Sequence, residues 1–180
     1  MTLTRPQMII ISVSAIVCAC ICVPLIILSV IRERIGNTTN NYINSTNMGL
    51  PRGYRNNNPL NIRRSNEMWL GEVRPSTDAA FKQFKNMGYG FRAALKLLRN
   101  YIGKGHNTIQ KIVNRWAPPE DGNFTSSYIN NVSVRSGIPA DRVIDRDDRE
   151  SLIAIAYAMA ISENGTAPER EDIEKGWEML

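Results

Sequence analysis

The stretch RESLIAIAYAMAISENG, Arg149 to Gly165, decides the fold that the sequence predicts. Its side chains are almost all apolar in the middle, and the run is long enough for about four helical turns. An aspartate just before it, Asp147 or Asp148, can cap the first turn. Asn164-Gly165 is a typical C-terminal stop. The stretch is therefore predicted to be the longest and most apolar helix of the domain, with most of its surface buried.

Glu163 lies in the last turn of this predicted helix. Helical spacing places it on the same face as three apolar residues, Leu152, Ala156 and Met159. Apolar neighbours and the negative end of the helix dipole both favour the protonated carboxyl. A general acid for glycoside cleavage is prepared in this way. The alternative is a Glu163 that turns outward and pairs with a neighbouring Lys or Arg.

Four further stretches carry apolar residues at helical spacing. The predicted helices run from about Tyr89 to Ile102, from Ile109 to Trp116 after a cap at Asn107 or Thr108, from Thr125 through Val132, and from Pro168 onward. The segments EMWLGEV (67–73) and DAAFKQF (78–84) are short enough to be two strands or extended pieces. The predicted class is mostly α, as an α+β domain with a small β-hairpin over residues 52–180.

The stretch RNNNPLNIRR, Arg55 to Arg64, is predicted to be a loop. Asn and Pro are turn residues, because Asn bonds its own backbone and tolerates left-handed geometry while Pro fixes φ. The loop has two interpretations. Its asparagines either cap the elements that follow or present oriented amide groups to a ligand.

The N-terminal region predicts a membrane anchor. Met8 to Ile31 contains no charge and is longer than the about 20 residues that a helix needs to cross a bilayer. A cleaved signal peptide would have a shorter apolar region. We therefore expect an anchor over 1–34 and an Asn/Thr/Ser-rich flexible tether over 35–51. The positive-inside rule leaves the orientation open, since both flanks are similarly basic.

The composition excludes several kinds of site. All three cysteines lie inside the apolar run, so the rest of the chain has no disulfide and no thiolate chemistry. His106 is the single histidine, which argues strongly against a His-rich zinc site. We expect no metal and no cofactor. Past Arg34 the chain has 19 basic and 16 acidic residues, a net charge of +3, which suits an anionic surface but is far from a nucleic-acid-binding signature, so no nucleic acid is expected as a partner.

A resemblance to known proteins covers Arg52 to about Trp177. The strings RGYRNNNPLNIRRS, W-x-G, D-x-x-F-x-x-F, YGFRAALKLLRNY, RWAPPEDGN and SENG resemble a family of phage and prophage proteins that open with RGIRNNNPGNIR. Those proteins are described as virion structural proteins, and some as lysozyme-like wall-degrading proteins. Leu60 departs from the family, which has Gly after the Pro. The resemblance implies a phage or prophage origin.

A fainter resemblance links the domain to bacterial glucosaminidases and lytic transglycosylases. Asn57 to Arg63, then Trp69-Leu70-Gly71, then Phe81-x-x-Phe84 follow the order of their motifs after the catalytic Glu-Ser-Gly helix. Here the helix that ends in Glu163-Asn164-Gly165 lies downstream instead. The resemblance therefore implies a lysozyme-like fold in circularly permuted order, which domains tolerate because their termini often lie close together.

The apolar run predicts a membrane-anchored, single-pass protein, and the resemblances imply a phage or prophage protein that cleaves peptidoglycan glycan strands as a muramidase, glucosaminidase or lytic transglycosylase. Its domain would face the cell wall from a virion or host membrane, with the lipid bilayer, the glycan strands and other virion proteins as partners. The candidate catalytic residues are Glu163, with Asp78 or Glu72 as a second carboxylate. The candidate sugar-binding residues are Asn57, Asn58, Asn61, Arg63, Trp69 and Trp116. The alternative is a non-catalytic virion protein with a glycan-binding domain.

Overall fold

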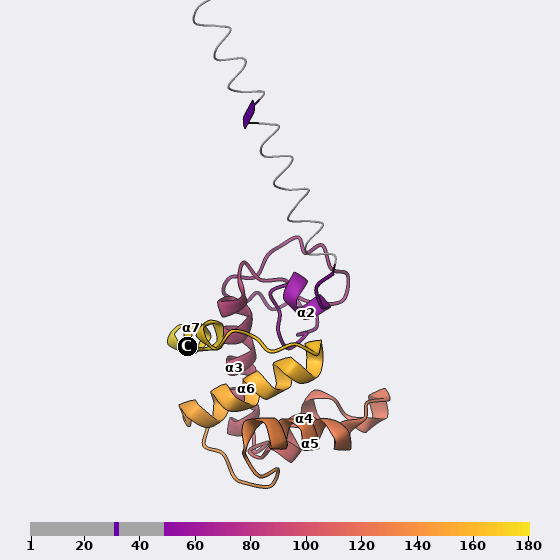
Figure 1. The fold of residues 1–180 in the computed structure, drawn as a ribbon, viewed down its shortest axis with the longest axis vertical. Helices are drawn as coiled ribbons and strands as arrows, with labels where there is room; N and C mark the ends of the chain where they lie inside the picture. Colours follow the sequence, from indigo (N-terminus) through magenta and orange to yellow (C-terminus); the bar gives the residue numbers. More distant parts are fainter. Residues whose placement is uncertain (1–30, 33–48) are drawn as a thin grey trace, which may run out of the picture. The chain divides into compact units, whose positions relative to one another are not determined.

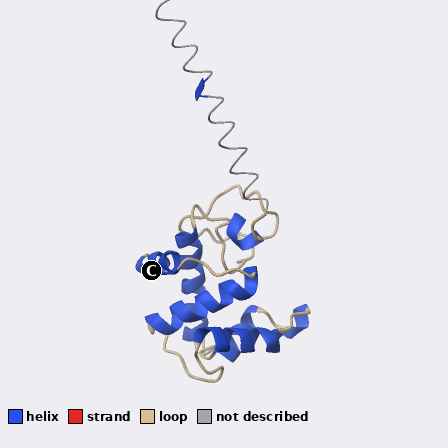
Figure 2. Ribbon diagram, viewed as in Figure 1, coloured by secondary structure: helices blue, strands red, loops and turns tan. Residues whose placement is uncertain are grey.

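The described part of the chain is mostly helical (Figures 1 and 2). The computed structural model describes residues 31–32 and 49–180, and the chain divides into the units Met1–Gly49 and Leu50–Leu180. The second unit contains the candidate site. Its helices are α2 (Arg52–Arg55), α3 (Met87–Gly103), α4 (Ile109–Trp116), the 3-10 turn η1 (Pro119–Asp121), α5 (Thr125–Ser136), α6 (Arg149–Asn164) and α7 (Arg170–Glu178).

Helix α6 is the central element and packs against α2, α3, α5 and α7. The Asp148 side chain caps its start by accepting a hydrogen bond from the backbone N–H of Ser151 at 3.1 Å. Gly165 ends it in the left-handed conformation, with a φ of 70°. Both ends lie where the sequence predicts them. Because the helix is apolar on most sides, it lies in the core, where the buried side chains are Leu152, Ile153, Ile155, Ala156, Ala158, Met159 and Ala160.

Helix α3 begins at Met87, two residues earlier than predicted, because the Asn86 side chain accepts the N–H of Tyr89 and caps it. Its early glycine, Gly90, lies directly against the Asn-rich loop. A Cβ there would lie 2.0 Å from the Asn57 carbonyl oxygen. The helix and the loop therefore contact each other through backbone atoms.

The predicted β-hairpin is wrong for the described residues. Within 49–180 the extended segments form only two isolated antiparallel bridges, Arg63 with Phe81 and Glu72 with Phe84. Side chains make hydrogen bonds to the backbone N–H and C=O groups that would otherwise pair between two strands. The Asp78 carboxylate accepts the N–H groups of two neighbouring residues, and the Arg74 guanidinium donates to three carbonyls of the 65–67 segment.

The remaining helices follow the sequence closely. Thr108 caps α4 by accepting the N–H of Lys111, and α5 begins at Thr125 as predicted. Helix α7 begins at Arg170 and not at Pro168. All of these helices contribute to one hydrophobic core that spans Leu60 to Ile173.

The predicted anchor, Met8 to Ile31, lies outside the described residues except for its last position, and so does most of the predicted tether. Among the residues that the structure does describe, no helix has the length and apolar character required to span a bilayer.

Candidate active site

The Asn-rich loop after α2 is held in shape by its own side chains. Asn58 is fully buried, accepts the N–H of Ile62 at 2.9 Å, and donates to the carbonyls of Ile62 and Lys82 at 3.0 and 2.9 Å. Asn57 donates to the Phe84 carbonyl at 3.0 Å. Asn57 and Asn61 both have a φ of 50°, a conformation that Asn adopts more easily than most residues. Asn57 and Asn58 therefore build the loop.

The fourth loop asparagine, Asn61, contacts Glu163. Its Nδ2 donates to Glu163 Oε2 at 3.0 Å, across 102 residues of sequence. Two more donors reach the other carboxylate oxygen, Oε1: the Trp116 indole N–H at 3.1 Å and the Tyr128 hydroxyl at 2.8 Å. All three donors are neutral. The structure thus brings the loop, the end of α4 and the first turn of α5 together around one half-buried carboxylate.

Asn164, the next residue along α6, ties the helix end to the loop. It is buried, and its Nδ2 donates to the Pro59 carbonyl at 2.7 Å and to the Ala160 carbonyl at 2.9 Å. Tyr54 adds a second link, because its hydroxyl donates to the Thr166 carbonyl at 3.1 Å. The loop and α2 are therefore both tied to the end of α6 at residues that directly follow Glu163.

A pocket of about 280 Å³ lies beside this carboxylate. Asn61 and Trp116, two of the three donors to Glu163, line it, so Glu163 lies directly behind the pocket wall. The lining combines planar polar groups, aromatic rings and one carboxylate, a chemistry that suits a polyhydroxylated ligand. The lining residues are Asn61, Ile62, Arg63, Leu97, Tyr101, Arg115, Trp116, Pro118 and Asp121.

Two arginines give the pocket a positive character. The Arg115 guanidinium lies 5.6 Å from the centre of the Tyr101 ring, and that ring meets Trp116 edge-on at 6.3 Å. Arg63 lies 5.8 Å from the Phe81 ring. Stacking of this kind orients a guanidinium without neutralising it. Both arginines can therefore donate to a ligand.

Tyr128 acts as a hydrogen-bond donor to Glu163. Burial raises the pKa of Tyr128 well above its ordinary value, and the charge and hydrogen bond of Glu163 raise it further. The hydroxyl therefore keeps its proton at any physiological pH.

The two other predicted carboxylates lie in separate polar networks. Asp78 accepts two hydrogen bonds from Arg52 at 2.7 and 2.8 Å and one from Asn56 at 2.8 Å. The Arg52 guanidinium, opposed by burial and helped by Asn56 and two backbone N–H groups, holds the pKa of Asp78 far below its usual range. Neither Asp78 nor Glu72 shares a hydrogen bond with Glu163.

Glu72 is buried and makes ion pairs with Arg74 at 2.8 Å and with Lys82 at 3.0 Å. Burial acts to raise the pKa of Glu72, but hydrogen bonds from Arg74, from the Trp69 backbone and from Lys82 outweigh it and lower the pKa. Glu72 is thus an ionised member of a structural ion pair.

Trp69 lies apart from the Glu163 pocket. It lines a separate pocket with Leu70, Arg92 and Lys96, and the Lys96 ammonium lies 6.0 Å from its ring. Its buried indole N–H has no hydrogen-bond partner among the described residues. The structure therefore groups Asn61, Arg63 and Trp116 around the pocket beside Glu163 and places Trp69 elsewhere.

Sequence reasoning missed four residues at this site, Tyr101, Arg115, Asp121 and Tyr128. Tyr101 and Tyr128 are spaced as core residues of their helices. Asp121 lies in a Pro-rich segment, where a charged residue is usually solvated. Arg115 precedes Trp116 in the RWAPPED motif, which was the available signal. In residues 31–32 and 49–180, the His, Cys, Asp and Glu side chains form no group of three that could hold a metal ion.

The chain has a phage relative. Protein P5 of Pseudoalteromonas phage PM2 is 41% identical to it over 132 residues, which is 71% of this chain and 80% of protein P5. The chain belongs to the family of protein P5. No family model matches it. The relation to P5 confirms the phage connection that the Asn-rich motif predicts.

Proposed function

We propose that this chain is a virion-associated, peptidoglycan-degrading protein that cleaves glycan strands with Glu163 as its catalytic acid. The observation that carries the proposal is the position of the Glu163 carboxylate. It lies at the end of the core helix α6, held by Asn61, Trp116 and Tyr128, behind the wall of a pocket with arginine and aromatic lining.

The three donors suit an acid that must give up its proton and take one back. Once Glu163 has protonated the glycosidic oxygen, it carries a negative charge. Hydrogen bonds from an amide, an indole and a hydroxyl stabilise that charge in a fixed geometry. In a lytic transglycosylase the same carboxylate then accepts the proton of the sugar hydroxyl that closes the ring.

The state of the other carboxylates favours a mechanism with one catalytic acid/base over a hydrolase mechanism with two carboxyl groups. A hydrolase needs a second carboxyl group about 5–10 Å from the first. Asp78 and Glu72 are neutralised by Arg52, Arg74 and Lys82. Among the described residues that line the pocket, Asp121 is the one carboxylate, and it is exposed at the rim. Lytic transglycosylation with Glu163 alone is therefore our first choice, and hydrolysis with Asp121 is the second.

The proposed fold is lysozyme-like in permuted order. Its support is the adjacency of the Asn57–Arg63 loop and the end of α6, which Asn164 joins through the Pro59 carbonyl. We propose that the apolar run Met8 to Ile31 anchors the protein in a membrane and that the domain faces the cell wall. That part rests on the sequence.

A non-catalytic virion protein that binds wall glycan is the second candidate. The observation in its favour is that Glu163 lies behind the pocket wall and already accepts three hydrogen bonds. Such a carboxylate also serves as a tie between α4, α5, α6 and the Asn-rich loop.

The test is the loss of turbidity of purified peptidoglycan incubated with the full chain in a non-ionic detergent. Glu163→Gln is compared with Glu150→Gln, a matched change at the exposed first turn of the same helix. Circular dichroism checks that all three proteins are equally folded. We expect clearing by the parent and by Glu150→Gln and none by Glu163→Gln, with 1,6-anhydro products by mass spectrometry.

Equal clearing by Glu163→Gln would remove Glu163 as the acid and leave the enzyme. Products with free reducing ends would favour hydrolysis. Absence of clearing by the folded parent would favour the glycan-binding protein.

A further inference from the structure

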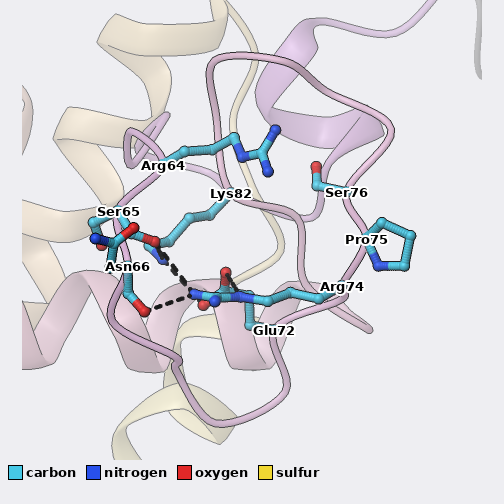
Figure 3. A pocket seen from close by; sticks show the side chains of 8 residues that line it. All are labelled: Arg64, Ser65, Asn66, Glu72, Arg74, Pro75, Ser76 and Lys82. Carbon is cyan, nitrogen blue, oxygen red and sulfur yellow. Dashed lines mark hydrogen bonds and ion pairs between the residues drawn. The ribbon is translucent and has the colours of Figure 1, made fainter.

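A second polar pocket lies among the extended segments between residues 64 and 82 (Figure 3). It has a volume of about 280 Å³ and is lined by Arg64, Ser65, Asn66, Glu72, Arg74, Pro75, Ser76 and Lys82. None of these residues lines the pocket beside Glu163. The proposed glycan cleavage therefore leaves this pocket without a role.

The base of this pocket is a fixed ion-pair network. Lys82 is 1% exposed and donates to Glu72 Oε2 at 3.0 Å and to the Glu67 carbonyl at 2.8 Å. Arg74 donates to Glu72 Oε1 at 2.8 Å and to the same Glu67 carbonyl at 2.6 Å. Two cations thus share one carboxylate and also hold the 65–67 backbone. The network keeps a net positive charge in a rigid frame.

Arg64 adds a third cation opposite this network. Figure 3 shows its side chain reaching across the pocket toward Ser76, with Arg74 and Glu72 on the other side. The only hydrogen bond that its guanidinium makes within the described residues is a long one, 3.5 Å, to the Asp78 carbonyl. The Asp78 carboxylate itself is paired with Arg52. Arg64 therefore has no carboxylate partner in residues 49–180.

The charges and donors match a tetrahedral oxyanion. Three cations face one carboxylate, Glu72, which leaves an excess of two positive charges in the lining. The Ser65 hydroxyl and the Asn66 amide follow Arg64 directly and make no side-chain hydrogen bonds among the described residues. A guanidinium, a hydroxyl and an amide on one edge can donate to different oxygens of one phosphate. The positive charges of Arg74 and Lys82 attract the same anion from the other side of the pocket.

We propose that this pocket binds a phosphate group, with Arg64 as its main donor. The phosphate can come from a free phosphate ion or from a phosphodiester such as a lipid headgroup. The chemistry is the same in both cases, because both present tetrahedral oxyanions to Arg64 and to the Ser65 and Asn66 donors.

The test measures the melting temperature of the full chain against ligand concentration at constant ionic strength. The ligands are inorganic phosphate, glycerophosphoglycerol as a soluble diester, and sodium acetate as a planar anion. We expect a saturable rise with one of the first two, because a ligand that binds only the folded state stabilises it by mass action. A larger rise with phosphate assigns a free ion, and a larger rise with the diester assigns a headgroup.

Arg64→Gln is the test variant, and Arg55→Gln, an exposed arginine of α2 outside the pocket, is the matched control. We expect Arg64→Gln to lose the rise and Arg55→Gln to keep it, while both variants clear peptidoglycan as the parent does. An equal rise in Arg64→Gln, an equal rise with acetate, or no rise with either phosphate compound would overturn the proposal. An unchanged melting temperature of the ligand-free Arg64→Gln variant shows that its fold is intact.

Discussion

At the scale of single residues, Glu163 depends on donors from three other segments of the chain. Tyr128 is the closest of them, with its hydroxyl 2.8 Å from Oε1. Its loss leaves part of a half-buried charge without a partner, and such bonds contribute about 1.5–3 kcal/mol. The stability of the domain and the orientation of its proposed acid are therefore coupled through one hydroxyl.

Tyr128→Phe is expected to lower the free energy of unfolding by about 1–3 kcal/mol, because it removes a hydrogen bond to a charged acceptor. It is also expected to slow peptidoglycan clearing by about tenfold, which corresponds to about 1.4 kcal/mol in the barrier. Urea unfolding and turbidity measure the two effects. Tyr157→Phe is the control, since the Tyr157 hydroxyl makes no hydrogen bond among the described residues. Equal behaviour of the two variants would contradict the role of Tyr128.

Arg52→Gln is expected to lower the melting temperature at pH 7, because Arg52 holds the pKa of Asp78 below its usual range. A carboxyl whose pKa is lowered by folding stabilises the protein above its unfolded pKa, about 3.9, and this stability is lost as the pH falls toward the folded pKa. The difference between parent and variant should therefore shrink below about pH 4. Melting curves from pH 7 to pH 2.5 measure it. A difference that stays constant over this range would show that Arg52 acts through packing alone.

The sequence indicated some of these residues and not others. Glu163 and Asn61 could be predicted together, because the resemblance to wall-cleaving enzymes joins an Asn-rich loop with a glutamate at a helix end. Tyr128 could not, since a tyrosine at core spacing gives no sign of where its hydroxyl points. Asp78 and Glu72 were candidates by charge alone. Their neutralisation by Arg52, Arg74 and Lys82 depends on contacts made after folding.

At the scale of elements, the contact between α3 and the Asn-rich loop depends on a missing side chain. A Cβ on Gly90 would lie 2.0 Å from the Asn57 carbonyl oxygen and 2.7 Å from Pro59. The first is a backbone atom and the second is part of the proline ring, so neither can move aside as the end of a flexible side chain can. The loop that carries Asn61 is thus positioned by the backbone of α3.

Gly90→Ala is expected to destabilise the domain by about 1–3 kcal/mol, because overpacking forces the backbone apart. In an open helix position the same change would stabilise by up to about 1 kcal/mol. Gly103→Ala provides that comparison, because the nearest atom to its Cβ would be Arg146 Nη1 at 3.8 Å. Urea midpoints measure both. A stabilised Gly90→Ala would mean that the loop can move away from α3 without loss.

Helices could be predicted better than extended segments because their signals are local. The apolar spacing of α6 and the caps at Thr108 and Asp148 lie within a few residues of the elements they define. The prediction of a β-hairpin was wrong because the Asp78 carboxylate accepts the N–H of Ala80 and the Arg74 guanidinium donates to the Glu67 carbonyl in place of a strand ladder. Alternating composition does not contain that information.

At the scale of the whole molecule, the net charge of +5 predicts a salt-dependent attraction to the anionic cell wall. The amount of protein that sediments with peptidoglycan should fall severalfold between about 0.05 and 0.5 M NaCl, since the screening length drops well below 10 Å at the higher salt. Glu163→Gln should show the same dependence, because it leaves the distribution of positive charge in place. Sedimentation that is insensitive to salt would assign the attraction to uncharged contacts.

The tie between Asn61 and Glu163 also has a consequence for the order in which the protein is made. Asn61 leaves the ribosome 102 residues before its partner. Asn164, which fixes the loop to α6, follows directly after Glu163, and the last helix, α7, packs against both α3 and α6. A nascent chain is synthesised from the N-terminus and completes only the contacts whose residues have emerged. The carboxylate site can therefore be completed only once α6 has emerged, long after the Asn-rich loop that forms its other side.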